Sequence, residues 1–101
     1  MYHMQPTSRV EREDIGLIDS TYNFKDLKEL SLNIITIPGG SASIKASKQE
    51  RLIIGRKGLG VAIIDGKYHQ LREDVVLEVR RGTDVTFTED SQVEFYLVES
   101  R

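Results

Sequence analysis

The chain has 101 residues, a formal net charge of −2 and no cysteine. The missing cysteines exclude a disulfide framework and a thiolate metal site. The charge balance lacks the basic surplus that is typical of nucleic-acid-binding proteins. No run approaches the roughly 20 apolar residues of a membrane span, and the amino terminus has no apolar core of signal-peptide length. We therefore expect a single cytoplasmic domain without nucleic-acid or membrane partners.

The amino-terminal part, residues 1–31, is predicted to be an arm and edge segment of the fold. Residues 1–9 have too few apolar side chains to fold alone, and residues 10–22 are expected to form an edge strand. Residues 23–30 fit two structures. Asn23 is a suitable N-cap and apolar residues follow it at helical spacing, but a continuing strand is equally compatible with so short a segment.

The rest of the chain, residues 32–101, has the pattern of a small all-β domain. Val85 and Phe87 alternate with threonines, and the same period of two recurs in the other runs, as in half-buried strands. Short turns separate the runs, and the βαβ rhythm of a parallel sheet is missing. We predict an antiparallel sandwich or barrel with strands over residues 32–37, 42–46, 52–54, 59–64, 68–71, 75–79, 85–87 and 93–98.

The clearest local signal is the pair Asp65-Gly66 between the apolar runs VAII and KYHQL. An Asp-Gly pair in this setting predicts a two-residue type I′ turn and therefore an antiparallel hairpin. Three glycines precede the hairpin, where a bulge or tight bend would turn a corner of the sheet; they are Gly55, Gly58 and Gly60.

A domain of this size and strand content has a limited core and exposed strand edges, so we expect a homodimer. Charge is also uneven along the chain, since residues 45–57 are mainly basic and residues 11–19 mainly acidic. Two interpretations remain for this asymmetry. It holds one copy against another, or it reflects two ordinary solvated faces.

The region from Pro38 to Glu99 resembles the cupin family of small jelly-roll barrels. The spacing of the first cupin segment fits from Gly39 to Gly58. The second cupin segment aligns with residues from Asp74 to Glu89, where Gly82 is the one residue identical to the family pattern. The hairpin between the two segments looks like the cupin hairpin. The resemblance therefore implies a small antiparallel jelly-roll or cupin barrel with an amino-terminal arm.

The resemblance also identifies four positions that bind a divalent metal in typical cupins. Here they hold Lys45, Ser47, Arg51 and Val85. Two cations repel a metal and valine offers no lone pair, so we expect no metal and no cofactor. The metal-dependent reactions of the family are excluded with the metal.

Lys45, Ser47 and Arg51 are candidates for an anion pocket inside the barrel, with Arg51 gripping a phosphate or carboxylate. Strand alternation favours the opposite interpretation. If Ala42 and Ile44 face the core, Lys45 and Ser47 face water. A buried site would also leave two cations unpaired in a small barrel.

Tyr68 and His69 are a second candidate pair, because metal-free cupin epimerases acting on nucleotide-linked sugars use an acid and a base. Adjacent strand residues point to opposite faces, so the alternative is a core tyrosine and a surface histidine. Two functions remain. The first is a metal-free binding or assembly module that homodimerises and whose ligand is unknown; the second is a sugar-binding or sugar-phosphate isomerase-like protein with a pocket for a small anionic or sugar ligand. A barrel filled with aliphatic side chains would favour the first.

Overall fold

The computed structural model describes residues 8–12, 17–23 and 29–100, and within these ranges every regular element is a β-strand. No helix in this described part is long and apolar enough to cross a membrane. The strands are β1 (Ser8–Arg12), β2 (Leu17–Asn23), β3 (Leu30–Ile37), β4 (Ala42–Ile44), β5 (Arg51–Ile64), β6 (Lys67–Arg72), β7 (Val76–Val79), β8 (Val85–Phe87) and β9 (Gln92–Ser100).

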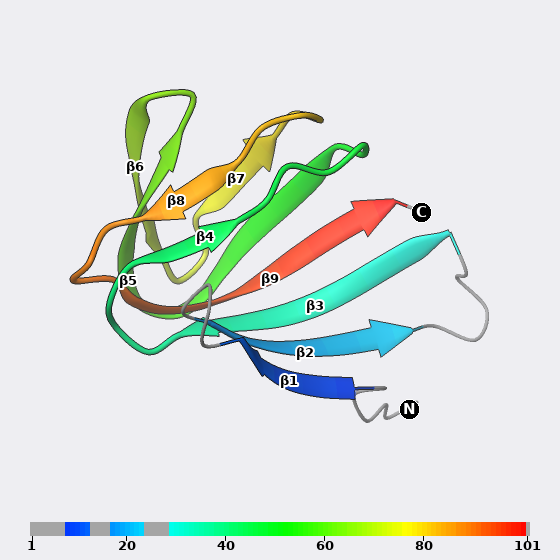
Figure 1. Ribbon diagram of the computed structural model, residues 1–101, viewed down its shortest axis with the longest axis horizontal. Coiled ribbons are helices and arrows are strands. Elements are labelled where there is room, and N and C mark those ends of the chain that lie inside the picture. The colour runs from blue at the N-terminus through cyan, green and yellow to red at the C-terminus, as the bar shows by residue number, and fades with distance from the viewer. Residues whose placement is uncertain (1–7, 13–16, 24–28, 101) are drawn as a thin grey trace.

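The strands pair antiparallel and form a sheet that curls over into two layers (Figure 1). The larger layer runs β1-β2-β3-β9-β5-β7, and the smaller one runs β6-β5-β8-β4. Strand β5 belongs to both layers, since its first half pairs with β9 and β7 and its second half with β8 and β6. The predicted all-β jelly-roll class is confirmed.

Strand β5 changes layer at a bulge between Gly55 and Lys57. The extra residue reverses which side chains face inward, because a strand alternates strictly between its two faces. Before the bulge the odd-numbered residues are buried, and from Gly60 onward the even-numbered ones are. A Cβ at Gly55 would collide with the backbone carbonyl oxygen of Arg72. The runs 52–54 and 59–64, which the sequence predicts as separate strands, are therefore one bent strand.

The hairpin after β5 has the predicted geometry. Asp65 and Gly66 have φ values of 51° and 75°, and Ile64 pairs with Lys67 across the turn. Positive φ at both central residues is the requirement of a type I′ turn, whose twist matches that of the flanking strands. The predicted pairing of VAII with KYHQL is confirmed.

The space between the layers is filled by apolar side chains. Phe87 of the smaller layer stacks on Phe95 of the larger one, with ring centroids 5.4 Å apart. Burying one large apolar side chain stabilises a fold by about 1.5–3 kcal/mol, so this core is the main source of stability. Its members are Leu17, Ile35, Ile37, Ala42, Ile44, Ile53, Ala62, Ile64, Leu71, Val79, Val85, Phe87, Val93, Phe95 and Leu97.

The amino-terminal segment adds two strands to the larger layer instead of the one predicted edge strand. β1 pairs with β2, and β2 pairs with β3. Asn23 ends β2 and Leu30 begins β3. The alternative of a short helix over residues 23–30 falls mostly on residues 24–28, which lie outside the described ranges.

Candidate functional site

Arg51 closes one end of the barrel. Its side chain points inward and is only 5% exposed. Nη1 donates to the carbonyl oxygen of Lys45 at 3.0 Å, and Nη2 donates to that of Thr83 at 2.9 Å. Burial lowers the pKa of Arg51, while Glu99 and Asp84 act in the opposite direction. The guanidinium thus ties the segment after β4 to the turn before β8.

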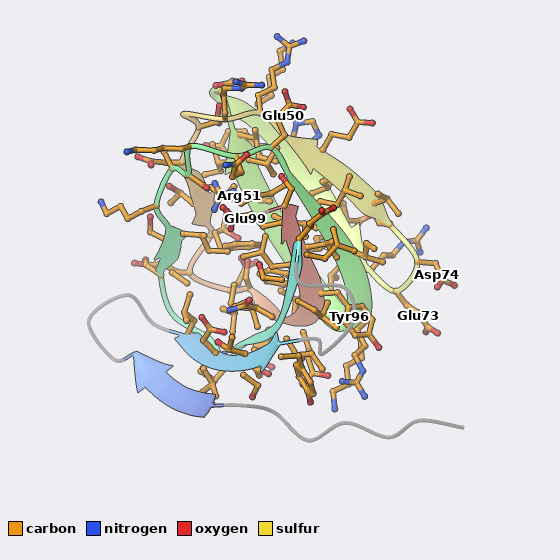
Figure 2. All side chains as sticks on the ribbon, turned by 90° about the vertical axis from the view of Figure 1, so that its right-hand side faces the viewer. Glu50, Arg51, Glu73, Asp74, Tyr96 and Glu99 are labelled. Atoms are coloured by element: carbon orange, nitrogen blue, oxygen red, sulfur yellow. The ribbon has the colours of Figure 1, made fainter. Side chains whose placement is uncertain are left out.

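Further hydrogen bonds close the same end of the barrel. The hydroxyl of Ser47 donates to the carboxylate of Glu99, which lies opposite Arg51 in the β5–β9 ladder. The amide of Gly82 donates to the carbonyl oxygen of Ser47 at 2.8 Å. Figure 2 looks into this end and shows Arg51 and Glu99 toward the middle of the ring of strands. This end is therefore a closed polar cluster.

The three candidates for an anion pocket have different environments. Lys45 is exposed, as strand alternation predicts. Ser47 is half-buried, because β4 ends at Ile44 and the alternation stops there. Arg51 faces inward, but both of its Nη groups donate hydrogen bonds to backbone carbonyl oxygens. The structure brings Ser47 and Arg51 to the same end of the barrel and leaves Lys45 in solvent.

Tyr68 and His69 lie on opposite faces of β6. The expectation of a core tyrosine and a surface histidine is wrong, since Tyr68 is 71% exposed and His69 is half-buried. The two-residue turn sets this register. It places Leu71 opposite Gly60 and in the core, so His69 shares the inner face and Tyr68 points away.

The fourth family metal position, Val85, lies in the core on β8. The described residues contain no group of three His, Cys, Asp or Glu side chains that could hold a metal ion. The absence of a bound metal stays a prediction.

The convex face of the larger layer carries apolar side chains from five neighbouring strands. Ile34, Tyr96, Ile54 and Val76 follow one another across β3, β9, β5 and β7. A second row lies beside the first across β2, β3, β9 and β5. All eight residues are half-buried or exposed. We call this surface the outer face; its residues are Tyr22, Leu32, Ile34, Leu52, Ile54, Val76, Tyr96 and Val98.

An ion-paired cluster borders the outer face on one side. Glu94 accepts a hydrogen bond from Thr36 at 3.0 Å and lies 3.3 Å from Arg56 and 3.8 Å from Lys57. The guanidinium of Arg56 also lies over the ring of Tyr96, 5.6 Å from its centroid. These charged side chains mark where the apolar rows of the outer face end on this side.

The outer face was not among the predictions from the sequence, although a signal for it exists there. Ile34-Ile35, Ile53-Ile54 and Tyr96-Leu97-Val98 are consecutive apolar residues within strands. A strand with one face in water alternates apolar with polar residues, and a continuous apolar run is typical of a strand that is covered on both faces.

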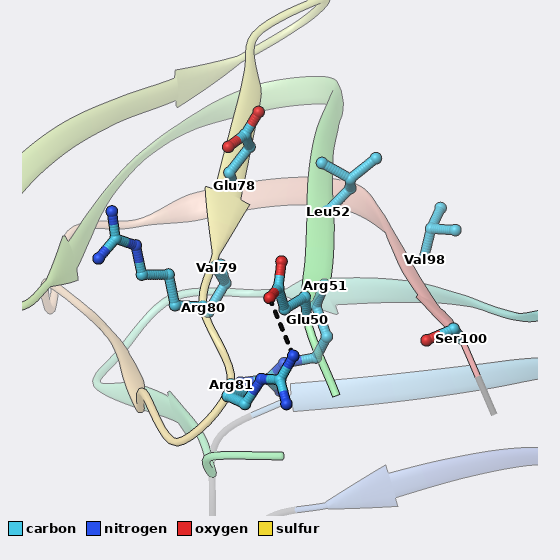
Figure 3. Close-up of a pocket in the computed structure, with 9 residues that line it drawn as sticks. All are labelled: Glu50, Arg51, Leu52, Glu78, Val79, Arg80, Arg81, Val98 and Ser100. Carbon is cyan, nitrogen blue, oxygen red and sulfur yellow. Dashed lines mark hydrogen bonds and ion pairs between the residues drawn. The ribbon is translucent and has the colours of Figure 1, made fainter. Parts of the chain in front are cut away.

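A pocket of about 700 Å³ opens where the outer face meets the ends of β5, β7 and β9 (Figure 3). Leu52 and Val98 of the outer face form part of its wall. Arg81 donates to Glu50 at 3.3 Å beside the opening. The lining residues are Glu50, Arg51, Leu52, Glu78, Val79, Arg80, Arg81, Val98 and Ser100.

Comparison with known proteins gives fold similarity without close sequence similarity. No protein-family model matches the sequence, and no curated protein matches it. The plu4264 protein of Photorhabdus luminescens superposes with a TM-score of 0.77 at 13% identity, over 98% of this chain and 85% of that one. The cupin domain of Cnp3 from Schizosaccharomyces pombe superposes with a TM-score of 0.69 at 15% identity, over 83% of this chain and 60% of that one. The chain has the cupin fold.

A third similar structure is Pac13, described as a nucleoside dehydratase, whose variants from Streptomyces were solved with uridine. It superposes on this cupin barrel with a TM-score of 0.76 at 12% identity, over 98% of this chain and 82% of that one. The resemblance to cupins that the sequence carries between Pro38 and Glu99 is confirmed at the level of the fold. At these identities the similarity establishes the fold alone, because one barrel supports many unrelated activities.

Proposed function

We propose that this cupin domain is an assembly module that forms a homodimer through the outer face. The observation that carries the proposal is the contiguity of eight apolar side chains over five strands of one sheet face. Exposed apolar patches of this kind mark interaction surfaces on monomeric folds, and a second copy of the same face is a complementary partner.

The size of the outer face supports the proposal. Five strands at about 4.8 Å spacing and three to four outward positions at about 6.8 Å give a surface of roughly 24 × 24 Å with its polar rim. This flat area of about 580 Å² is below the ~800 Å² of accessible surface that each partner buries in a standard protein interface, and the projecting side chains add to it. Val76, at 55% exposure, is the most exposed of the eight residues.

The charges around the outer face fit a two-fold interface. Such an interface brings the same patch of both copies together, so it needs groups of both signs. Glu94, Arg56 and Lys57 border one side. The opposite side of the outer face, where the pocket opens, carries Glu50, Glu78, Arg80 and Arg81. Each side carries both carboxylates and cations.

The filled barrel supports assembly rather than chemistry inside the lumen. Among the residues that the structure describes, Arg51 and Ser91 are the only buried polar ones. Arg51 donates to backbone carbonyls, and the Ser91 hydroxyl accepts from the amide of Val61 at 3.1 Å. A sugar-acting enzyme needs convergent titratable groups facing a cavity, and the candidate pair Tyr68 and His69 diverges.

The test is the oligomeric state of the full chain, measured by light scattering at tens of micromolar. We expect twice the 11.5 kDa mass of the chain. Ile34→Glu and Val76→Glu should give monomers, since each buries an unpaired carboxylate in the interface. Leu59→Glu is the matched control, because Leu59 is 52% exposed but lies off the outer face. A monomeric parent protein, or equal loss of association in the control, would refute the proposal.

A further inference from the structure

We propose that a second pocket, on the outward side of the smaller layer, binds a neutral pyranose ring. Leu59 and Val61 lie beneath the ring, and Gln70, Asp90 and Gln92 bind the hydroxyl groups at its edge. The pocket has a volume of about 410 Å³, within the range of small-molecule sites. None of its lining residues belongs to the outer face, so the inference goes beyond the proposed assembly and does not depend on it.

The floor of the pocket is apolar because of the register of β5. Beyond the bulge the even-numbered residues of this strand are buried, so Leu59 and Val61 point outward on the same face. Leu59 is 52% exposed, and its neighbour Gly58 has no side chain to cover it. The C–H bonds on the face of a pyranose ring are apolar surface, whose removal from water by these two side chains is favourable.

Polar side chains border this floor on both sides. Val61 pairs with Gln70 of β6, and Leu59 pairs with Gln92 of β9. A carboxamide both donates and accepts hydrogen bonds, as a sugar hydroxyl does. In a pyranose with equatorial hydroxyls, the C–H bonds point to the two faces and the hydroxyls radiate around the edge. An apolar floor between two polar borders therefore matches such a ring.

Asp90 is held at the rim by a chain of hydrogen bonds that starts in the core. The amide of Val61 donates to Oγ of Ser91 at 3.1 Å, and Ser91 is only 1% exposed. Oγ of Ser91 lies 3.0 Å from Oγ1 of Thr88, which donates to Oδ1 of Asp90 at 2.7 Å. Since Thr88 has a single hydroxyl proton, Ser91 is the donor in the middle link. The chain positions Asp90 and occupies one of its two carboxylate oxygens, and the other can accept from a ligand hydroxyl.

The charge of the lining favours an uncharged ligand. Asp90 is the one charged side chain among the described lining residues, and no cation in the described ranges lies within 4 Å of its carboxylate. An anionic ligand would be repelled by Asp90 and would find no guanidinium or ammonium partner. A cation would pair with Asp90 but would offer no acceptor to the N–H groups of Gln70 and Gln92. A neutral ring with several hydroxyls matches the donors and the acceptors together.

The test titrates methyl β-D-glucopyranoside, whose ring substituents are all equatorial, into the full chain and follows amide shifts in NMR spectra. We expect saturable shifts that are largest at Val61, Gln70 and Asp90. Cyclohexanol and cyclohexylammonium are the matched probes, because they keep a six-membered ring and replace the set of hydroxyls by one hydroxyl or one positive charge. Each should bind at least about tenfold more weakly. Absence of saturable shifts with the glucoside, or equal or tighter binding of either probe, would overturn the proposal.

Asp90→Asn should weaken binding of the glucoside about tenfold, because a hydrogen bond to a charged acceptor is replaced by a neutral one. Asparagine can still accept from Thr88, so the turn should keep its shape. Asp65→Asn is the control, since it removes one carboxylate at the hairpin tip, outside the pocket. Unchanged affinity in Asp90→Asn would overturn the proposal.

Leu59→Glu separates this proposal from the assembly. It places a carboxylate on the apolar floor, so it should abolish binding of the glucoside and leave the dimer intact. Val76→Glu should do the reverse, because Val76 belongs to the outer face and lies outside this pocket. Binding of the glucoside by Leu59→Glu with the affinity of the parent would overturn the placement of the ring.

Discussion

The guanidinium of Arg51 donates to the carbonyl oxygen of Thr83, 32 residues further along the chain, at 2.9 Å. The same side chain also bonds the carbonyl oxygen of Lys45. At the position that the sequence resemblance aligns with a cupin metal ligand, this chain has a cation whose hydrogen bonds hold two loops together. The barrel end is closed by a side chain where the resemblance would have placed a metal ion.

Arg51→Met should destabilise the fold by about 2–3 kcal/mol. The substitution leaves two partly buried carbonyl groups without these donors, each at a cost of about 1–3 kcal/mol, and relief of the desolvated charge offsets part of that loss. Urea unfolding followed by circular dichroism measures the change. Lys45→Met is the matched control, and its exposed side chain predicts an effect within about 0.5 kcal/mol. Equal stability of Arg51→Met and the parent would show that the two carbonyl contacts do not hold the end of the barrel.

Phe95→Ala should destabilise the fold by about 3–5 kcal/mol, because the stacked pair Phe87–Phe95 joins the two layers and a cavity would replace one ring. Phe95→Leu keeps most of the volume and should cost much less, about 1.5 kcal/mol. Thermal and denaturant melts of both variants give the comparison. Similar losses for alanine and leucine would contradict a cavity as the cause.

Gly66→Val should destabilise the fold by about 1–3 kcal/mol, the range for a residue forced into a sparsely populated backbone region. Gly66 has a φ of 75°, and a Cβ there would meet nothing within 4 Å, so backbone strain is the only source of the cost. Asp65→Asn is the control and should be nearly silent, since asparagine serves the same turn position. A Gly66→Val protein that melts like the parent would contradict the role of the turn.

The purified protein should contain no stoichiometric transition metal, and adding zinc, manganese, iron or nickel should leave its melting temperature unchanged. A metal that bound only the folded state would raise stability in proportion to the logarithm of its concentration. Elemental analysis after mild purification is the direct measurement. Near one equivalent of metal would overturn the assignment of Lys45, Ser47, Arg51 and Val85 to the four family positions.

The regular parts of the fold could be predicted from the sequence because each depends on local information. The alternation through Val85 and Phe87, and later through Val93, Phe95 and Leu97, places the correct side chains in the core. The Asp65-Gly66 turn sets its own register by backbone sterics. Neither feature requires knowledge of which strands become neighbours.

The environments of single residues at the candidate sites depend on long-range neighbours and were harder to predict. Ser47 is half-buried and bonds Glu99, 52 residues away. The exposure of Tyr68 follows from the pairing of Leu71 with Gly60. Arg80 directly follows β7, and only the assembled ends of three strands create the pocket beside it.

Because of the bulge in β5, the number of residues in this strand matters to the fold as much as the type of each residue. Loss of the extra residue between Gly55 and Lys57 would remove the bulge and leave a regularly alternating strand, in which Gly60 and Ala62 still face inward. The strand would lose the local bend that carries it from the larger layer into the smaller one, whatever its side chains are. We expect a lost codon in this segment to be more damaging than an exchanged one, and alignments of related chains to have no gaps there.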